Sequence, residues 1–196
     1  MSEEVNEKTL LAREELAGHY KSIINLLGED VDREGLLKTP ERVAKAMQFL
    51  TKGYHEDPAA VLRGAMFKEE DYKQMVIVKD IDIFSYCEHH MALMYDMSIS
   101  IGYIPKGRVI GLSKIPRIAE MCCKRLQLQE KIGEDIAEVI SLATGSDDVI
   151  VHITSSHSCM SARGIKSTDS QTTTLTTKGV FNEDHMIHRF MLMKQS

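Results

Sequence analysis

Four segments of the chain have the composition of β-strands, and their order around a helical region limits the fold more than any other feature does. Their sequences are QMVIVKDIDIFSYC (74–87), SISIGYIPKGRVIGL (98–112), GSDDVIVHITSSHSCM (145–160) and SQTTTLTTKGVF (170–181). The second is expected to form two strands joined by a turn at Pro105-Lys106-Gly107. Residues 113–143 follow a helical period that is expected to break near residues 129–131.

The first fifty residues are expected to form two helices. Apolar residues recur with a helical period over residues 5–27, and Gly28 follows where a helix would end. A second helix is expected in KTPERVAKAMQFL (38–50), with Thr39 as its N-cap and Pro40 in its first position, where the missing N–H costs nothing.

This order of elements predicts an α+β protein in which helices pack on one face of an antiparallel sheet. We expect an N-terminal helical segment over residues 1–55 and the main domain over residues 56–196, as one continuous structural unit. An apolar content of 43% and a charged content of 27% are typical of a globular domain.

Composition also excludes several classes of protein. No segment is apolar enough to span a membrane, and the start MSEEVNEK has none of the features of a signal peptide, so we expect a cytoplasmic protein. The net charge of −5 argues against a nucleic-acid partner. An anionic ligand would therefore have to meet a local cluster of Lys and Arg.

The four cysteines are too few and too unevenly spaced for a disulfide scaffold, which favours metal binding or catalysis. Cys87 and His90 are three residues apart, a spacing that one tight turn brings onto a single ion. If the strand continues beyond Val149, His157 and Cys159 point to the same side. Cys87, His90 and Cys159 would then form the Cys₂His set of a catalytic zinc, with a position left for water.

Other interpretations of these residues stay open. The zinc could be structural and closed by His157 or His89, or the cysteines could be ordinary buried thiols, as we expect for Cys122 and Cys123. If the zinc is catalytic, it makes hydroxide available near neutral pH, and that hydroxide needs a proton partner. His89 and His157 are the nearest histidines that are not needed as ligands.

Cations gather in two short segments. In GLSKIPRIAE, Ser113 stands at an expected helix start, with Lys114 and Arg117 in the first turn. Free N–H groups at such a start favour phosphate, although an ordinary capped helix with solvated cations explains the same pattern. SARGIK adds Arg163 and Lys166 only a few residues after the last cysteine.

RLQLQEK (125–131) brings Gln129 and Glu130 into the helical region. The ordinary explanation is a solvated polar face. A carboxylate in a ligand pocket would instead accept two N–H bonds from a guanine edge, a pattern that adenine does not offer.

Five segments together resemble type I GTP cyclohydrolase, the zinc-dependent form. They are LLKTPERVAKAMQFL (36–50), CEHH (87–90), YIPKGRVIGLSKIPRI (103–118), RLQLQE (125–130) and HSCMSARGI (157–165). They occur in the order and with the spacing of that family, from residue 36 to residue 181.

The resemblance implies conversion of GTP and water to 7,8-dihydroneopterin triphosphate and formate, the first step of tetrahydrofolate or pterin biosynthesis. It implies zinc-bound hydroxide that attacks C8 of the guanine. It also implies the tunnelling fold, in which subunits pool their sheets into a barrel, and a homodecamer with active sites at subunit interfaces. The sequence identifies no regulatory protein partner.

The resemblance also implies a role for each matching residue. Zinc would be held by Cys87, His90 and Cys159; His157 would protonate the purine ring and His89 would assist ribose opening; Glu130 with Gln129 would anchor guanine; Ser113, Lys114, Arg117 and Arg163 would contact the triphosphate; Arg42 and Lys45 would come from a neighbouring subunit.

One segment departs from the family pattern. MALMYDMSISIG (91–102) is one residue longer, so we expect a bulge or a longer turn there, because a slip of one residue would turn the strand inside out.

Three other classes of function would place different requirements on these residues. A nucleobase deaminase would need Cys-x-x-Cys, which the chain lacks. A non-catalytic nucleotide-binding relative would hold a structural zinc, and a reductase of the same fold would use a cysteine nucleophile without zinc.

Overall fold

A computed structural model describes residues 7–69 and 71–195 and divides the chain after Thr51 into two compact units. The sequence placed this division after residue 55. Among the described residues, no helix combines the length and the apolar character needed to cross a membrane.

The first unit is a pair of helices, α1 (Glu7–Leu26) and α2 (Thr39–Leu50). The predicted helix over residues 5–27 corresponds to α1, with residues 5 and 6 outside the described part. The N-cap of α2 is Lys38, so the prediction of Thr39 was one residue late. For the same reason Pro40, predicted as the first helical residue, is the second. Arg13 Nε donates to Gln48 Oε1 at 2.8 Å and joins the two helices.

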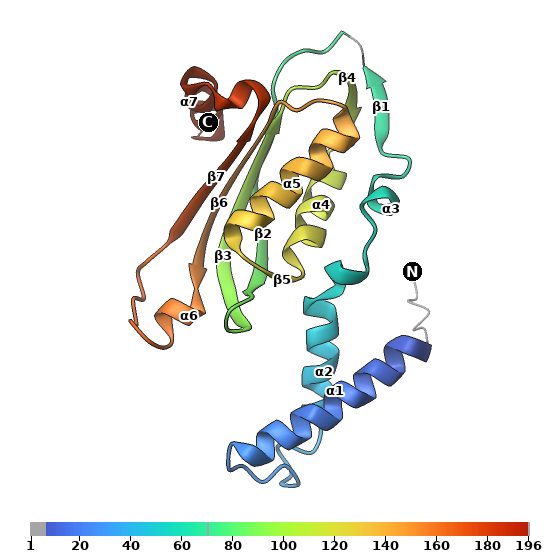
Figure 1. The fold of residues 1–196 in the computed structure, drawn as a ribbon, viewed down its shortest axis with the longest axis vertical. Coiled ribbons are helices and arrows are strands. Elements are labelled where there is room, and N and C mark those ends of the chain that lie inside the picture. The colour runs from blue at the N-terminus through green and yellow to red at the C-terminus, as the bar shows by residue number, and fades with distance from the viewer. Residues whose placement is uncertain (1–6, 70, 196) are drawn as a thin grey trace. The chain divides into compact units, whose positions relative to one another are not determined.

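The second unit is built on a five-stranded sheet with the order β5-β2-β3-β6-β7 (Figure 1). Its strands are β2 (Val76–Cys87), β3 (Ala92–Tyr103), β5 (Leu126–Gln127), β6 (Val149–His157) and β7 (Thr172–Lys178). Neighbouring strands from β2 to β7 run antiparallel, and only the short β5 is parallel to β2. The architecture is α+β, as predicted.

Helices α4 (Lys114–Cys123) and α5 (Gln129–Thr144) cover one face of this sheet, as Figure 1 shows. The main core lies between them and the inward-facing residues of the strands, including Val151 and Ile153 of β6. Cys122 and Cys123 are fully buried in this core, which confirms them as packing residues, and burial raises the pKa of Cys122 to about 12.

A smaller apolar cluster covers the opposite face of the sheet. Helix α7 (Asp184–Gln195), preceded by the turn η2 (Gly179–Asn182), packs Phe190 against Ile150 of β6. Because side chains alternate along a strand, β6 is buried on both faces, which explains the mainly apolar run VIVHI in its first half.

After the predicted turn the chain leaves the large sheet and forms strand β4 (Gly107–Ile110). It pairs instead with β1 (Met66–Glu69) in a separate two-stranded sheet. Ile104 N–H donates to the Asp148 carbonyl at 3.0 Å, so the chain stays attached to the large sheet until it turns. Beside β1, the chain also forms the short helices η1 (Lys52–His55) and α3 (Pro58–Leu62).

The break in the helical region comes earlier than predicted. Helix α4 ends at Cys123 and β5 intervenes before α5 begins at Gln129. Pairing of β5 with Tyr86 and Cys87 of β2 explains the position of the break, because an extended pair cannot form within a continuous helix.

Two residues with positive φ mark bulges in the paired strands β2 and β3. Asp96 has φ 50°, and between Tyr95 and Ser98 strand β3 uses one residue more than β6. Asp80 has φ 56°, at the point where β2 uses one residue more than β3. A bulge is thus present in the segment where one was expected, and the strand keeps its inward face.

Replacing Asp96 by Val should lower the free energy of unfolding by about 1–2 kcal/mol, because a β-branched residue is strained at positive φ. Asp96→Gly should keep or raise stability. Asp82, exposed on β2 and without positive φ, provides the matched control Asp82→Val. Urea unfolding at fixed protein concentration measures all three, and equal effects of the two Val substitutions would contradict the bulge at Asp96.

Candidate metal centre and active site

The turn that follows β2 carries the first two candidate ligands. β2 ends at Cys87, which pairs with Ala92 at the start of β3, so the turn from Cys87 to His90 is short. Glu88 N–H donates to the Gln127 carbonyl at 3.1 Å, which fastens this turn to β5. Met91 closes the turn with φ 49°.

Cys159 lies in the short helix α6 (Ser158–Ser161) and not on an extension of β6. The expected extended backbone from Val149 to Cys159 was therefore wrong beyond His157. The side chain of Ser161 stabilises the change of direction. Its Oγ donates to the His157 carbonyl at 3.3 Å and lies 3.2 Å from Tyr95 Oη. These contacts hold α6 against β3 and fix the position of the Cys159 thiol.

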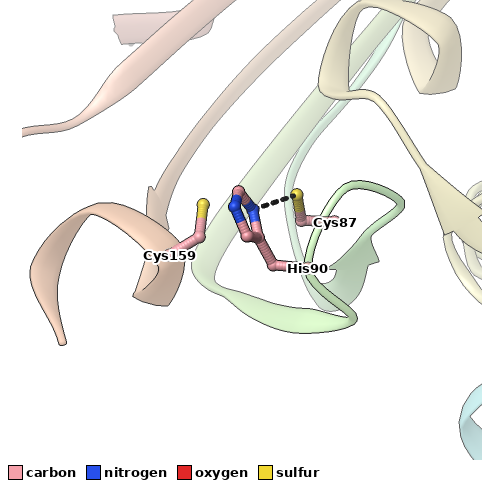
Figure 2. A group of neighbouring side chains, drawn as sticks. All are labelled: Cys87, His90 and Cys159. Carbon is pink, nitrogen blue, oxygen red and sulfur yellow. Dashed lines mark hydrogen bonds between the residues drawn. The ribbon is translucent and has the colours of Figure 1, made fainter. Parts of the chain in front are cut away.

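Cys87, His90 and Cys159 nevertheless converge, as Figure 2 shows. Their ligand atoms all lie within 4.8 Å of one another, and Cys87 Sγ is 3.9 Å from His90 Nδ1. Sulfur and nitrogen bound to one tetrahedral zinc lie roughly 3.6 Å apart, given bond lengths of about 2.3 and 2.1 Å. A small contraction would therefore seat a zinc ion, and the donor set is one that zinc prefers.

The surroundings of Cys159 favour its protonated thiol. Burial, followed by the nearby Cys87 sulfur, raises the pKa of Cys159, and the more distant Arg163 guanidinium partly offsets this. Zinc binding requires thiolates, so uptake of the ion would release protons.

His157 is held beside this cluster at the end of β6. Its Nε2 lies 2.9 Å from Gln129 Oε1 at the start of α5. Burial lowers the pKa of His157, while the Glu130 carboxylate pulls it upwards. His157 and Glu130 therefore lie close enough to interact.

His89 is in a different environment. Its side chain is 63% exposed, and its Nε2 lies 3.9 Å from Glu88 Oε1. Its ring meets that of His90 edge to face, with centroids 6.2 Å apart. His89 is thus open to solvent and lies next to the candidate ligand His90.

Gln129 and Glu130 are neighbours in the first turn of α5 but face different surroundings. Glu130 is exposed. Gln129 is 2% exposed, and its amide contacts residues of β6 and β7. Sequence reasoning missed the contact between Gln129 and His157, because nothing in the local pattern relates residues that are 28 positions apart.

The residues at the start of α4 that are candidates for phosphate binding differ in their hydrogen bonds within the protein. Ser113 is the N-cap residue, and its side chain makes no capping bond. Lys114 Nζ donates to the Val61 carbonyl of α3 at 2.9 Å, and Arg117 is exposed. Arg163 is exposed in the loop after α6.

Arg42 and Lys45 are exposed on α2, in the first unit. The candidate cluster belongs to the second unit.

An α+β domain that combines a Cys₂His cluster with neighbouring non-ligand histidines has the arrangement of a metal-dependent enzyme. The sequence profile of the family described as GTP cyclohydrolase I matches residues 16–195. The chain belongs to the GTP cyclohydrolase I family, whose members are enzymes, and its fold is the tunnelling fold predicted from the sequence.

Named relatives agree with this assignment over nearly their whole length. The chain is 58% identical to GTP cyclohydrolase 1 of Parabacteroides distasonis over 188 residues, which cover 96% of this chain and 95% of that protein. It is 53% identical to the enzyme of Porphyromonas gingivalis over 176 residues, 90% of each chain. It is 48% identical to that of Ruminiclostridium cellulolyticum over 189 residues, 92% of this chain and 97% of that protein.

Purified protein should contain about one zinc per chain, and Cys159→Ser should lose most of it, because serine is a poor zinc ligand. Cys122→Ala provides the control, since Cys122 is a buried cysteine outside the cluster. Metal content by inductively coupled plasma mass spectrometry, with circular dichroism to check folding, measures the effect. Full zinc content in folded Cys159→Ser would exclude Cys159 as a ligand.

Proposed function

We propose that this protein converts GTP and water to 7,8-dihydroneopterin triphosphate and formate, the first step of tetrahydrofolate or pterin biosynthesis. The observation that carries the proposal is the convergence of Cys87, His90 and Cys159 next to His157, in a chain of the GTP cyclohydrolase I family. A cytoplasmic location, expected from the sequence, stays a prediction.

Cys87, His90 and Cys159 would hold the metal, and three protein ligands leave one tetrahedral position for water or substrate. Zinc bound there would lower the pKa of its water to about 7 and so supply a nucleophile at neutral pH. Because no fourth candidate ligand joins this group among the described residues, the set favours an open catalytic site over a closed structural one.

His157 and His89 would move protons on two sides of the site. His157 is partly buried and close to Glu130, which suits a group that protonates the purine ring during its opening. His89 is exposed, with Glu88 beside its ring, which suits the later opening of the ribose at the mouth of the site.

Glu130 would recognise the guanine base of GTP through hydrogen bonds. Its carboxylate is exposed at the N-terminal turn of α5, where the helix dipole favours a negative charge. Two N–H groups of the guanine edge would bind its two oxygens, and a base that lacks this pair would leave the carboxylate without partners.

Ser113, Lys114, Arg117 and Arg163 would bind the triphosphate. Ser113 and Arg117 are exposed at the start of α4, so their side chains can reach a phosphate there. The backbone N–H groups of Lys114 and Ile115 already donate to the Gly111 and Leu112 carbonyls, so the side chains carry this proposal. Lys114 would exchange its bond to the Val61 carbonyl for a phosphate oxygen when GTP binds. Arg42 and Lys45 would be cations that a neighbouring subunit contributes to the site.

A homodecamer with active sites between subunits also belongs to this proposal. Among the described residues, β7 pairs only with β6, and along most of its length β2 pairs only with β3. Both edges of the sheet therefore present backbone groups that another strand could bind. Joining such edges in a closed ring would produce the barrel of the tunnelling fold.

Incubation of the purified protein with GTP should release formate and give a fluorescent pterin after oxidation. His157→Ala should lower kcat by at least about 100-fold, since general acid–base groups contribute about 10²–10⁴-fold, and it should retain zinc. Absence of formate with GTP would refute the proposed reaction. Loss of zinc from folded His157→Ala would instead identify His157 as a ligand.

Glu130→Ala should raise the KM for GTP by about 10–100-fold, because the guanine N–H groups lose a charged acceptor worth about 1.5–3 kcal/mol. Glu134, exposed one turn further along α5, gives the control Glu134→Ala. Steady-state formate release with GTP and with ATP measures both variants. Unchanged GTP kinetics, or equal activity of the unmodified protein on ATP, would refute a base-reading role.

A further inference from the structure

Gln129 has the most completely engaged polar side chain in the candidate active site. Its Nε2 lies 3.2 Å from the Ile153 carbonyl, 3.1 Å from the Thr172 carbonyl and 3.3 Å from Thr174 Oγ1. Its Oε1 lies 2.6 Å from Ser155 Oγ and 2.9 Å from His157 Nε2. One amide therefore joins the start of α5 to both β6 and β7.

These contacts define which end of the amide is which. Two of the three neighbours on the Nε2 side are backbone carbonyls, which only accept hydrogen bonds, so the NH₂ group must face them. The atom that faces His157 is then the amide oxygen, which only accepts. Consequently His157 must donate, and its proton lies on Nε2.

We propose that Gln129 is a positioning residue, which holds the His157 ring in the Nε2–H tautomer and leaves Nδ1 as the atom that exchanges a proton with the substrate. The proposal rests on the proposed function of His157. In the reacting step His157 starts as the imidazolium, with a proton on each ring nitrogen; the N–H bond at Nδ1 breaks and that proton forms an N–H bond at a purine nitrogen. The ring is left neutral, with Nε2–H still bound to Gln129.

A direct contact of Gln129 with the guanine, implied by the family resemblance, fits these observations less well. The side chain is 2% exposed, and both ends of its amide already have protein partners. Binding substrate would leave at least one buried carbonyl or the His157 N–H without a partner, which costs about 1–3 kcal/mol.

The surroundings keep this amide in place. Ile153, Ser155 and His157 share one side of β6, the side that α5 covers. A Cβ atom on Gly133 would lie 2.3 Å from Thr176 Oγ1, so α5 approaches β7 as closely as a glycine allows. Little space is left for the helix start to shift, and the ring of His157 is fixed accordingly.

Kinetics of Gln129→Met test the proposal, because methionine has a similar length but no acceptor for His157. We expect kcat to fall about 10–100-fold, as for a misplaced catalytic group, with the KM for GTP and the zinc content within about twofold of the unmodified protein. Thr174→Val is the matched control. It removes one neighbour from the other end of the same amide and leaves both carbonyl acceptors, so kcat should stay within about twofold.

Three kinetic results would overturn the proposal. One is an unchanged kcat in Gln129→Met. Another is a raised KM with unchanged kcat, which would make Gln129 a substrate contact. The third is an equal loss of kcat in Thr174→Val, which would reduce Gln129 to a packing residue.

The tautomer itself provides a second measurement that needs no folded variant of Gln129. In zinc-containing protein labelled with ¹⁵N-histidine, long-range ¹H–¹⁵N spectra report which ring nitrogen carries the proton, and His157→Asn identifies the signals of His157. We expect the neutral ring to carry its proton on Nε2, and a proton on Nδ1 would overturn the proposal. If the unmodified protein released no formate from GTP, the proposed function would fail, while the tautomer would still decide the contact with Gln129.

Discussion

The attachment of the start of α5 to the sheet is the constraint on which the site depends. Residues 127–129 make two connections within three positions. The Gln127 carbonyl accepts a hydrogen bond from Glu88 in the turn that carries Cys87 and His90, and the Gln129 side chain contacts His157. The same short segment therefore holds both the turn that carries the candidate ligands Cys87 and His90 and the histidine at the end of β6.

The sheet can carry these groups because its middle is rigid. β6 is buried on both faces, by α5 on one side and by α7 through Ile150 on the other, so its backbone is fixed before it reaches the site. The strand then ends at His157, and α6 turns the chain so that Cys159 faces the β2 turn. The contacts of Ser161 with His157 and Tyr95 hold α6, which carries Cys159, against the sheet.

Sequence reasoning predicted the parts of this protein that depend on local pattern. Alternating and periodic apolar residues indicated the main strands and helices, and the spacing of Cys87 and His90 indicated one half of the metal cluster. Sequence reasoning failed where contacts between distant residues determine the local structure. The pairing of β5 with β2 broke the helical region early, and a helical turn replaced the expected extended backbone at Cys159. The buried amide of Gln129 was equally out of reach, because its partners come from two distant strands.

The resemblance predicts one extra residue in the segment after the turn that carries Cys87 and His90, and the pairing of β3 explains why such a residue would not disturb these candidate ligands. Between the turn and the bulge at Asp96, Met94 pairs with Ser85 on one side and with His157 on the other, so the three strands stay aligned beside the site. The additional residue is accommodated beyond this point, at a positive φ that Asp tolerates better than most residues. Because the turn is fastened through Glu88 and Gln127, on the far side from the bulge, the bulge changes the course of β3 and leaves Cys87 and His90 where β2 places them.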